Sequence, residues 1–288
     1  MKILLTGSSG YLGSLFKIYL KDQHQFITFT RQDIDLYHPE LIKDFFEPLD
    51  FDVCLHLAAN AQTKACEDSP ELTSKINLES TVELAKVAKN KNARFIFFSS
   101  EQVFNAQSNA PFTEETPPLS ISVYGQQKIA GEKYIIENLQ NYLIVRLSWM
   151  FGLSSYNIKA SPNIIKNVIN ALLYQKPTKF TVNEHRGMTY ARQLVENFEN
   201  LLQCPSGILH FSSNNSFNTY ESACFIASEL GLTLNQIEKY ILPDLDKYAD
   251  NPRDYRLSNK KALQLGFTLG DFSSDVRSCL QDFAYKNN

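Results

Sequence analysis

Tyr124 and Lys128 are four residues apart, a spacing that places a phenol and an ammonium on one face of a helix. A free phenol titrates near pH ~10 and is a poor acid–base group at neutral pH. A neighbouring Lys⁺, together with the positive ring of an oxidised nicotinamide, favours the phenolate and lowers that pKa. We therefore expect Tyr124 to give a proton to a carbonyl oxygen as hydride reaches the carbon, with Lys128 assisting it and holding ribose hydroxyls.

Ser100 stands just after an apolar run, residues 94–98, that predicts a buried strand. From the end of a strand its hydroxyl can donate a hydrogen bond to the reacting oxygen and polarise the carbonyl. Taken singly, a serine there is more often a turn or cap residue, and a Tyr–Lys pair is more often a surface pair. Their order along the chain, after the glycine turn described next, favours a catalytic trio of Ser100, Tyr124 and Lys128.

A glycine-rich turn, GSSGYLG, lies between a predicted strand at residues 2–6 and a predicted helix at residues 11–20. Gly7 permits the tight turn, Gly10 lets the backbone approach a pyrophosphate, and Gly13 lets the helix pack closely. The start of the helix then offers free N–H groups to phosphates. A glycine turn without a ligand is the plain alternative, but its place at the start of an α/β chain predicts dinucleotide binding.

The second predicted strand, residues 26–29, ends where the two dinucleotides differ. A carboxylate there would bind the adenosine ribose hydroxyls of NADH, whereas an arginine suits the 2′-phosphate of NADPH. Arg31 follows this strand and the first carboxylate is Asp33, so the sequence favours NADPH and leaves NADH open. Asp35 and Leu36 lie just beyond and are predicted to reach the adenine.

A further predicted strand, residues 53–57, runs into two alanines. Leu57, Ala58 and Ala59 would lie at the carboxyl edge of a parallel sheet, where such sheets bind ligands. Small side chains would let the nicotinamide ribose lie flat on this edge, although an alanine pair by itself indicates only tight packing. We assign these three residues to the cofactor site.

Strands and helical patterns alternate through the first half of the chain. Apolar runs predict strands at residues 2–6, 26–29, 53–57, 94–98 and 142–146, and helical periodicity covers residues 11–20, 70–89 and 128–139. This alternation predicts an α/β fold with a Rossmann, doubly wound parallel sheet covered by helices on both faces.

Beyond Gly152 the pattern loosens and predicts a smaller C-terminal substrate-binding lobe. Helices are expected near residues 163–175, 192–202 and 220–230, strands near 180–182 and 208–211, and a loop at 250–254 before a final helical piece. We expect the dinucleotide-binding domain at residues 1–150, with returns near 186–235, and the lobe at 151–185 and 236–288.

The composition lacks any extreme of charge or hydropathy. Of 288 residues, 43% are hydrophobic, and a net charge of −3 with a pI near 6.0 gives no electrostatic case for nucleic acid. No long apolar run predicts a membrane span, and the N-terminal apolar stretch breaks at Gly7, unlike a signal peptide. Five scattered cysteines and five histidines lack the spacing of metal ligands or disulfides, which predicts no metal and a cytoplasmic location.

Five segments form a series along the chain. They are SSEQVF at residues 99–104, YGQQKIAGE at 124–132, RLSWMFG at 146–152, RGMTYA at 186–191 and PRDYRL at 252–257. In this series the sequence resembles the extended short-chain dehydrogenase/reductase family, and within it the dTDP-4-dehydrorhamnose reductases. The resemblance runs nearly end to end and implies an oxidoreductase of nucleotide-sugar metabolism.

The resemblance also implies roles for single residues. Tyr124 would be the proton donor, Lys128 its partner, and Ser100 the counterpart of the family's threonine. Tyr11 and Leu12 would join Gly10 in cradling the cofactor. Trp149 would line the sugar pocket, and Glu101 would lie beside the substrate.

Departures from the family's pattern leave the exact sugar open. Glu101 and Gln102 stand where the family has Asp and Tyr, and Met188 stands where a proline is usual. The segment at residues 252–257 also differs from the family's Arg-Pro run, so contacts from this stretch to the nucleotide are not assigned.

The leading hypothesis is therefore NAD(P)H-dependent reduction of a nucleotide-linked 4-keto-6-deoxy sugar. An epimerase of the same fold is an alternative, and a dehydratase is disfavoured because Glu101 is followed by Gln102 instead of a second acid. A non-catalytic, cofactor-binding regulatory subunit is a third hypothesis, weakened by the intact trio. Neither nucleic acid nor a membrane is expected as a partner, and a homodimer is left open.

Overall fold

The computed structural model describes residues 1–155 and 157–283, which form two compact units. The first unit comprises residues 1–107, 114–147 and 198–209, and the second comprises residues 108–113, 148–197 and 210 onward. The return of the chain to the first unit is thus a short stretch inside the 186–235 region expected from sequence.

The first unit is built on a six-stranded sheet with the order β10-β5-β4-β3-β1-β2. Its strands are β1 (Lys2–Thr6), β2 (Gln25–Thr28), β3 (Val53–His56), β4 (Arg94–Ser100), β5 (Tyr142–Leu147) and β10 (Gly207–Phe211). β1 pairs in parallel with β2 on one side and with β3 on the other, and the β3–β4 and β4–β5 pairs are also parallel. Because the chain extends from β1 in both directions, the predicted doubly wound Rossmann fold is confirmed, with its switch point between β1 and β3.

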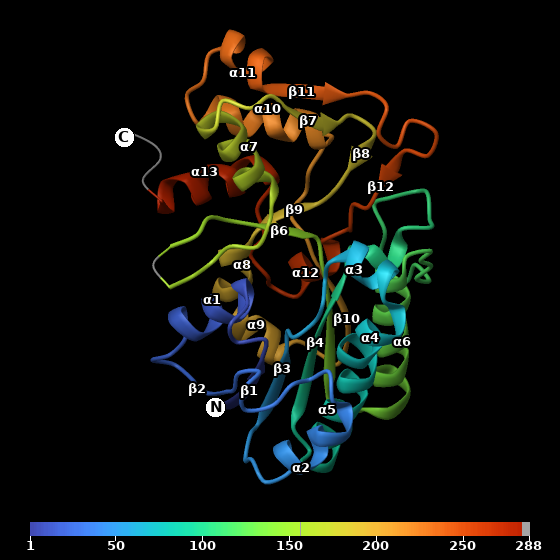
Figure 1. Ribbon diagram of the computed structural model, residues 1–288. Helices are drawn as coiled ribbons and strands as arrows, with labels where there is room; N and C mark the ends of the chain where they lie inside the picture. The colour runs from blue at the N-terminus through green and yellow to red at the C-terminus, as the bar shows by residue number, and fades with distance from the viewer. Residues whose placement is uncertain (156, 284–288) are drawn as a thin grey trace. The chain divides into compact units, whose positions relative to one another are not determined.

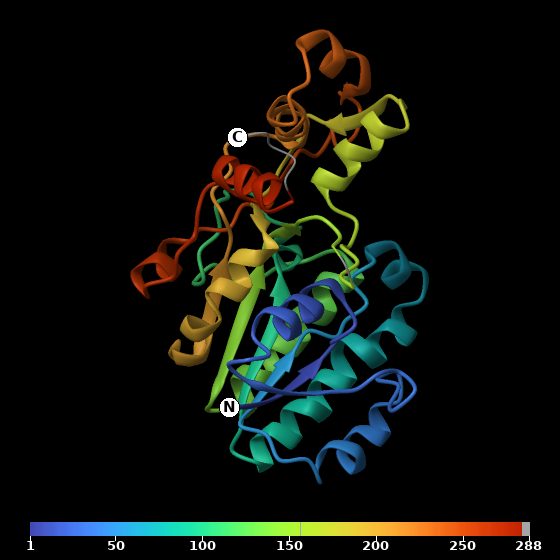
Figure 2. The same cartoon turned by 90° about the vertical axis from the view of Figure 1, so that its left-hand side faces the viewer.

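Helices cover both faces of this sheet (Figure 1 and Figure 2). α1 (Tyr11–Tyr19) and α9 (Phe198–Gln203) lie on one face, where the ring centroids of Phe16 and Phe198 are 5.2 Å apart. The other face carries α2 (Ile42–Phe46), α5 (Ser80–Asn90) and α6 (Val123–Asn138). A strand between two helical layers must be apolar on both faces, which explains the continuous apolar runs in the sequence.

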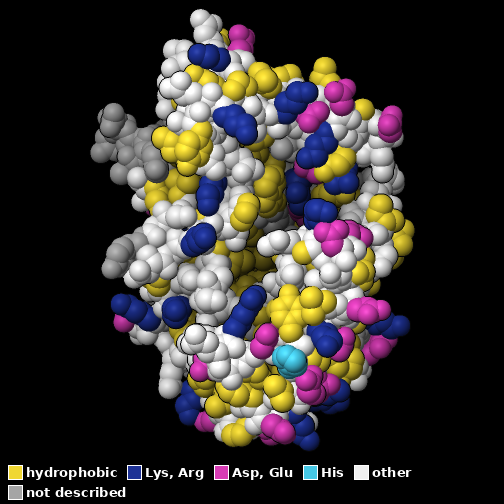
Figure 3. All heavy atoms as spheres, viewed as in Figure 1, with side chains coloured by type: hydrophobic (Ala, Val, Ile, Leu, Met, Phe, Trp, Pro, Cys, Tyr) yellow, Lys and Arg dark blue, Asp and Glu magenta, His cyan; other side chains and the backbone are white. Residues whose placement is uncertain are grey.

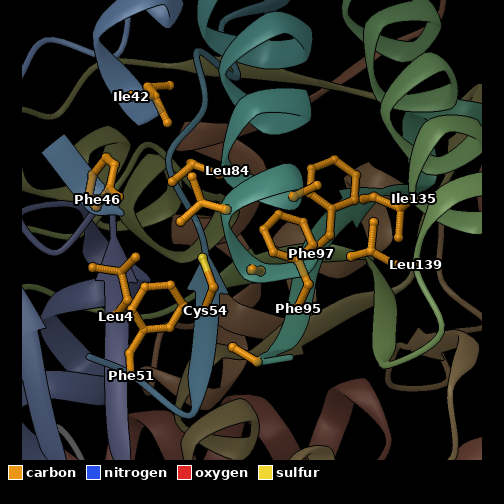
Figure 4. Packing of buried hydrophobic residues seen from close by; sticks show 14 of the residues in the cluster. Leu4, Ile42, Phe46, Phe51, Cys54, Leu84, Phe95, Phe97, Ile135 and Leu139 are labelled. Carbon is orange, nitrogen blue, oxygen red and sulfur yellow. The ribbon is translucent and has the colours of Figure 1, made fainter. Parts of the chain in front are cut away.

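The core beneath α5 and α6 fixes these helices on the sheet. Figure 4 shows Phe95 and Phe97 of β4 among apolar side chains that include Leu84 of α5 and Ile135 of α6. All four are at most 1% exposed. Since burying one such side chain contributes roughly 1.5–3 kcal/mol, this layer determines where the functional face of α6 lies.

The predicted helix at residues 70–89 is interrupted by a π-helical turn. α4 (Pro70–Ser74) leads into the π turn η2 (Lys75–Glu79), which leads into α5. Single π turns inside α-helices are rare and are frequent at functional sites. The turn contains Asn77, whose side chain is fully buried, and periodicity alone did not predict it. The unit also contains the short helical segments η1 (Pro39–Leu41), α3 (Thr63–Asp68) and η3 (Glu101–Phe104).

The second unit combines short strand pairs with helices. Its elements are β6 (Trp149–Phe151), α7 (Ile164–Leu173), β7 (Thr178–Thr181), β8 (Glu184–His185), β9 (Met188–Tyr190), α8 (Ala191–Glu196), α10 (Thr219–Glu229), α11 (Leu234–Tyr240), β11 (Ile241–Asp244), β12 (Arg253–Asp254), α12 (Lys260–Gln264) and α13 (Phe272–Asp282). β6 pairs with β9, β7 with β11 and β8 with β12. Phe151, Ile165, Met188, Ile226 and Val276 contribute to a core within this unit.

The helix expected at residues 192–202 is in fact two helices, α8 and α9. They separate at Asn197, whose side-chain amide donates to the carbonyl oxygens of Gln193 and Thr268 at 2.9 and 2.8 Å. A polar side chain that bonds to backbone groups competes with the helical ladder and ends it. The loop expected at residues 250–254 likewise contains the short strand β12.

Asp275 of α13 is a buried acid that joins three segments of the second unit. Its carboxylate accepts hydrogen bonds from the Tyr190 amide at 2.9 Å, from the Ser213 hydroxyl at 2.7 Å and from the Gln193 side chain. Burial nevertheless raises the pKa of Asp275 to about 7. The folded protein thus keeps a proton that the unfolded chain releases near pH ~4.

Stability should therefore fall as pH rises from about 4 to about 7, because over this range the folded state binds more protons than the unfolded state. Between pH ~5 and ~8 we expect Asp275 alone to account for a loss of about 2 kcal/mol, and Asp275→Asn to remove that part of the slope. Urea unfolding of both proteins at the two pH values measures it. Parallel slopes in the two proteins would contradict the prediction.

The surface of the first unit carries both signs of charge. Figure 3 shows Lys and Arg side chains interspersed with Asp and Glu side chains over the viewed face of this unit. Among the helices of residues 1–155 and 157–283, none has both the length and the apolarity needed to cross a membrane. The same part of the chain contains no group of three or more His, Cys, Asp or Glu side chains arranged to hold a metal ion.

Candidate active site

The glycine turn between β1 and α1 forms a cradle that side chains would fill. Gly7 has a φ of +69°, and a Cβ there would stand 2.9 Å from the amide nitrogen of Ala58. A Cβ on Gly13 would overlap the carbonyl oxygen of Gly7. α1 begins after Gly10 with no side-chain cap and no acidic residue in its first turn. No side chain of the helix start competes for its first N–H groups, and the cradle fits the pyrophosphate of a dinucleotide.

Leu57 and Ala58 lie against this turn, and Ala59 follows them in the segment that the sequence assigned to the cofactor site. They follow β3, and the Ala58 amide donates to the Thr6 hydroxyl at the end of β1 at 3.0 Å. The contact between Gly7 and Ala58 places the alanine pair at the switch point of the sheet. Tyr11 and Leu12 open α1 at the same edge.

The residues after β2 include the candidate ligands for the adenosine, and these differ in whether their side chains already have partners. The Asp33 carboxylate accepts from the Thr30 amide at 2.7 Å and from the Thr30 hydroxyl at 2.9 Å, and these bonds lower the pKa of Asp33. It is therefore already engaged in a local turn, whereas the Arg31 side chain is exposed. Asp35 accepts from the Tyr37 amide at 3.1 Å, and Leu36 is buried beside it.

Ser100, Tyr124 and Lys128 meet at the end of β4. Tyr124 and Lys128 lie one turn apart on the buried face of α6, and the Ser100 side chain is near enough to the Tyr124 hydroxyl to lower its pKa. The Lys128 ammonium lies 5.9 Å from the centre of the Tyr124 ring and 4.5 Å from that of Phe97. It donates to the carbonyl oxygen of Phe98 at 2.9 Å. The structure thus brings together the three residues that were predicted from spacing alone.

The start of α6 is fixed one residue before Tyr124. Ser122 caps the helix, accepting from the Gly125 amide at 3.2 Å and from Asn105 at 2.6 Å. A Cβ on Gly125 would overlap the Ser120 side chain, so only glycine lets the helix start this close to the preceding loop. This close approach sets the position of the neighbouring phenol.

Burial raises the pKa of the Tyr124 phenol, and the neighbouring Ser100 side chain offsets only part of this effect. The sequence-based expectation was the opposite, a pKa lowered by Lys128 and an oxidised nicotinamide. Spacing indicated the ammonium but not the desolvation of the phenol, which is the larger effect in the protein alone. A raised pKa keeps the phenol protonated at neutral pH, as a proton donor in a reduction must be.

A chain of buried polar groups beneath the site was not predicted from the sequence. His56 Nδ1 lies 2.8 Å from the Thr6 hydroxyl and His56 Nε2 lies 2.9 Å from the Thr81 hydroxyl, which donates to the Asn77 carbonyl at 3.0 Å. Burial, with the charge of Lys128, lowers the pKa of His56 to about 3, so the ring is neutral. It joins β1, β3 and α5 without taking part in proton transfer at neutral pH.

Asn77 connects the cofactor edge to the catalytic helix. Its side-chain oxygen accepts from the Asn60 amide at 2.8 Å, and its side-chain nitrogen donates to the Asn60 carbonyl at 3.1 Å and to Gln127 at 2.7 Å. Gln127 precedes Lys128 and donates to the Thr73 hydroxyl at 3.1 Å. In the sequence, the only signal for this connection was an Asn among the apolar residues of a helical pattern.

Comparison with known proteins identifies the group to which this chain belongs. The family model described as "RmlD substrate binding domain" matches residues 1–285. The chain is a member of the RmlD substrate-binding-domain family.

Relatives of this RmlD-family chain have several kinds of name, two of which bear on its function. Methionine adenosyltransferase 2 subunit beta of Rattus norvegicus is 26% identical over 92% of this chain and 82% of the relative. The dTDP-4-dehydrorhamnose reductase of Burkholderia thailandensis is 23% identical over 98% of this chain and 99% of the relative. The resemblance inferred from the sequence motifs is thereby confirmed.

Solved structures agree with the fold of the family member. A dTDP-4-dehydrorhamnose reductase from Yersinia enterocolitica has a TM-score of 0.85 at 26% identity and covers 98% of this chain and 99% of its own. The corresponding enzyme from Bacillus anthracis, solved with NADP, has a TM-score of 0.85 at 21% identity and covers 98% of each chain.

Two residues with predicted substrate roles lie in different units of this RmlD-family chain. Glu101 follows Ser100 in the first unit, is 1% exposed, and has a charge that raises the pKa of Tyr124. Trp149 begins β6 in the second unit and is partly exposed.

Trp149 belongs to a series of alternating rings and cations in the second unit. The Arg186 guanidinium lies 4.9 Å from the Trp149 ring centre and 5.7 Å from that of Tyr255. Arg253 lies 5.9 Å from the Tyr255 ring centre and 3.6 Å from that of Tyr248. Both arginines occur in the motif segments at residues 186–191 and 252–257, but no role was predicted for either of them. Interleaved arginines and aromatics were the available signal.

Proposed function

We propose that this protein is an NADPH-dependent reductase of a nucleotide-linked 4-keto-6-deoxy sugar. The observation that carries the proposal is the convergence of Ser100, Tyr124 and Lys128 at the end of β4, in the same unit as the open glycine cradle. Membership of the RmlD family and the dTDP-4-dehydrorhamnose reductases among its relatives support the substrate class.

The chemistry follows from the protonation states of these side chains. Gly7, Gly10 and Gly13 would hold the pyrophosphate of NADPH, which when bound would supply the hydride for the ketone carbon. Tyr124, protonated because burial raises its pKa, donates the proton that converts the ketone oxygen to a hydroxyl. Ser100 donates a hydrogen bond to the same oxygen and polarises the carbonyl. Lys128 stabilises the phenolate left on Tyr124 until solvent returns the proton.

The substrate role of the second unit rests on its cations and rings. We assign Trp149 to the sugar, as its resemblance to the family motif implies. Arg186 and Arg253 supply the planar cations that bind diphosphate oxygens, and Tyr255 and Tyr248 hold these guanidinium groups in place. Glu101, buried beside Ser100, is assigned to a hydroxyl of the sugar.

The preference for NADPH is assigned to Arg31. The Asp33 carboxylate is engaged by Thr30, while Arg31 is exposed and can reach a 2′-phosphate. We expect Arg31→Ala to weaken NADPH binding by about ten-fold, ~1.4 kcal/mol, because one charge-assisted contact is lost. Binding of NADH should change less than about two-fold, which isothermal titration with both cofactors measures.

Arg277→Ala is the matched control for Arg31, since this exposed arginine pairs with Glu229 in the second unit. It should bind both cofactors as the unmodified protein does. Equal losses for NADPH and NADH in Arg31→Ala would contradict the assignment to the 2′-phosphate.

The test of the proposed reaction is an NADPH oxidation assay with a panel of nucleotide-linked 4-keto sugars. A reductase consumes one NADPH for each ketone reduced, whereas an epimerase regenerates its cofactor and shows no net consumption. Absence of turnover across the panel, with NADPH still bound, would favour the alternative of a non-catalytic, cofactor-binding subunit, and relatives named as subunits of an adenosyltransferase are among those of this chain.

A second part of the proposal concerns the cellular compartment and the oligomeric state of the protein. Its five cysteines are free thiols, which fits a reducing compartment, and we place the enzyme in the cytoplasm. A homodimer is proposed as the oligomeric state. A groove of about 700 Å³ lies between α5 and α6, with Leu78, Val82, Ala130 and Tyr134 among its lining residues. Sedimentation at equilibrium distinguishes a dimer from a single 32.9 kDa chain.

A further inference from the structure

A fully buried ion pair lies one turn beyond Lys128 on α6. Arg146 of β5 donates from Nε to both carboxylate oxygens of Glu132, at 3.0 and 3.2 Å, and from Nη2 to one of them at 2.6 Å. The exposed fractions of the two side chains are 1% and 3%. Two charges are removed from water here at a large desolvation cost, so a contribution to stability alone is weak grounds for keeping the pair.

The pair connects the elements that carry the catalytic trio. Glu132 lies four residues after Lys128 and eight after Tyr124, on the same buried face of α6. Arg146 is directly opposite Ser99 in the β4–β5 register, one residue before Ser100. Its guanidinium also lies 5.0 Å from the ring centre of Phe104, at the end of η3. A single carboxylate–guanidinium contact therefore fixes α6 relative to the end of β4 and the segment that follows it.

The pair also determines the charge that surrounds Lys128. The titratable groups facing this ammonium are Tyr124 and Glu132 from α6, His56 from β3 and Cys66 from α3. His56 is neutral, and Tyr124 and the Cys66 thiol hold their protons because burial raises their pKa values. Glu132 is thus the carboxylate that offsets the desolvation of Lys128.

We propose that the Glu132–Arg146 pair is a positioning device of the site, holding the Tyr124–Lys128 face of α6 at the end of β4 and keeping the Lys128 ammonium charged at neutral pH. This inference rests on the proposed reductase function for its kinetic consequence. Its structural part concerns one ammonium and can be measured without any substrate.

The charge of Lys128 is the quantity to measure. Burial lowers the pKa of Lys128 to about 8, close to the pH at which an enzyme works, so a small further change alters its charge. Glu132→Gln removes the opposing carboxylate and leaves the Arg146 guanidinium unpaired nearby. We expect the Lys128 titration midpoint to move down by about one pH unit in this variant.

The first experiment is a ¹⁵N NMR titration of the lysine ammonium groups in the full-length protein, with Lys128→Met used to assign the Lys128 resonance. The second is the pH profile of kcat/KM for NADPH-dependent ketone reduction. In Glu132→Gln the alkaline limb should move down with the NMR midpoint, so that activity at pH 8 falls about ten-fold relative to activity at pH 6.5. In the unmodified protein the Lys128 resonance should titrate near pH ~8.

Two further variants separate positioning from simple loss of stability. Ile135→Val shortens a fully buried side chain on the same helix and should lower the melting temperature without moving the Lys128 midpoint. The double variant Glu132→Leu/Arg146→Met replaces the pair by apolar groups, which keeps the fold intact if Glu132→Gln does not fold. Its melting temperature should recover while the Lys128 midpoint stays below that of the unmodified protein.

The outcomes are distinct. A Lys128 midpoint unchanged in both Glu132 variants would overturn the inference, whatever happens to activity. A midpoint that falls equally in Ile135→Val would also overturn it, because any loosening of α6 would then be enough. A lowered midpoint in a protein that reduces no keto sugar would support the inference and refute the proposed function.

Discussion

Tyr124→Phe is expected to lower kcat/KM for ketone reduction by about 10²- to 10⁴-fold, because the variant lacks the proton that the product oxygen requires. The ring is buried on α6, so loss of one oxygen atom leaves the packing of the helix in place. Binding of NADPH should change less than about two-fold, since the pyrophosphate cradle is formed by the glycine turn and not by the phenol.

Steady-state kinetics and NADPH titration of the same preparation test this prediction. Tyr134→Phe is the matched control: it makes the same change on the same helix, at a partly exposed position that lines the α5–α6 groove. It should retain the kinetics of the unmodified enzyme. Turnover of Tyr124→Phe within about three-fold of the unmodified enzyme would assign proton donation to another group, such as Glu101 or solvent.

The parts of the fold that sequence predicted are those fixed by a repeating local pattern. The central strands of the first unit, β1, β3, β4 and β5, are largely buried and therefore read as apolar runs, and each was located within one or two residues. The run at residues 94–98, for example, continues as β4 to Ser100. Elements stabilised by a few long-range contacts were missed, including the two-residue strands β8 and β12. Two residues are too few to show any periodicity.

The π turn and the break between α8 and α9 each contain a buried Asn side chain. Asn197 donates to the carbonyl oxygens of Gln193 and Thr268 and so competes with the helical ladder, whereas Asn77 bonds to Asn60 and Gln127, which lie outside its own helix. The sequence shows an Asn within a helical pattern, which is an ordinary surface feature. Only the tertiary contacts determine whether it interrupts the helix.

The candidate site likewise has features that the sequence predicted and features that it did not. The glycine spacing and the Tyr124–Lys128 spacing describe contacts within one turn or one helix, and the structure contains both as expected. The direction of the Tyr124 pKa was wrong because desolvation depends on the whole surrounding core. The partners of His56 come from strands and helices 25 and 50 residues away, and no local pattern indicates them.

The second prediction with a large expected effect concerns the glycine turn. A substitution there can remove the pyrophosphate site without altering Ser100, Tyr124 or Lys128. A Cβ on Gly13 would overlap the carbonyl oxygen of Gly7, so Gly13→Ala must push the start of α1 away from β1. The N–H groups of Gly10 and the first turn of α1 would then no longer converge on a pyrophosphate. We expect the Kd for NADPH to rise by at least about 30-fold, ~2 kcal/mol, as two or more charge-assisted hydrogen bonds are lost.

Gly131→Ala is the matched control for Gly13→Ala, since it is the same change inside a helix of the first unit. A Cβ at Gly131 would meet the Phe97 ring at 3.3 Å, a tight contact in the core beside α6 that lies outside the glycine turn. The control should lose stability while its NADPH affinity stays within about two-fold of the original. Fluorescence titration measures the affinity of both variants, and chemical unfolding measures their stability.

If Gly13→Ala binds NADPH normally, the dinucleotide does not occupy this turn, and the phosphate site must be sought at another edge of the sheet. If instead both variants lose affinity in proportion to their stability, the effect of Gly13 is one of folding, and the cradle is not the determinant of cofactor binding.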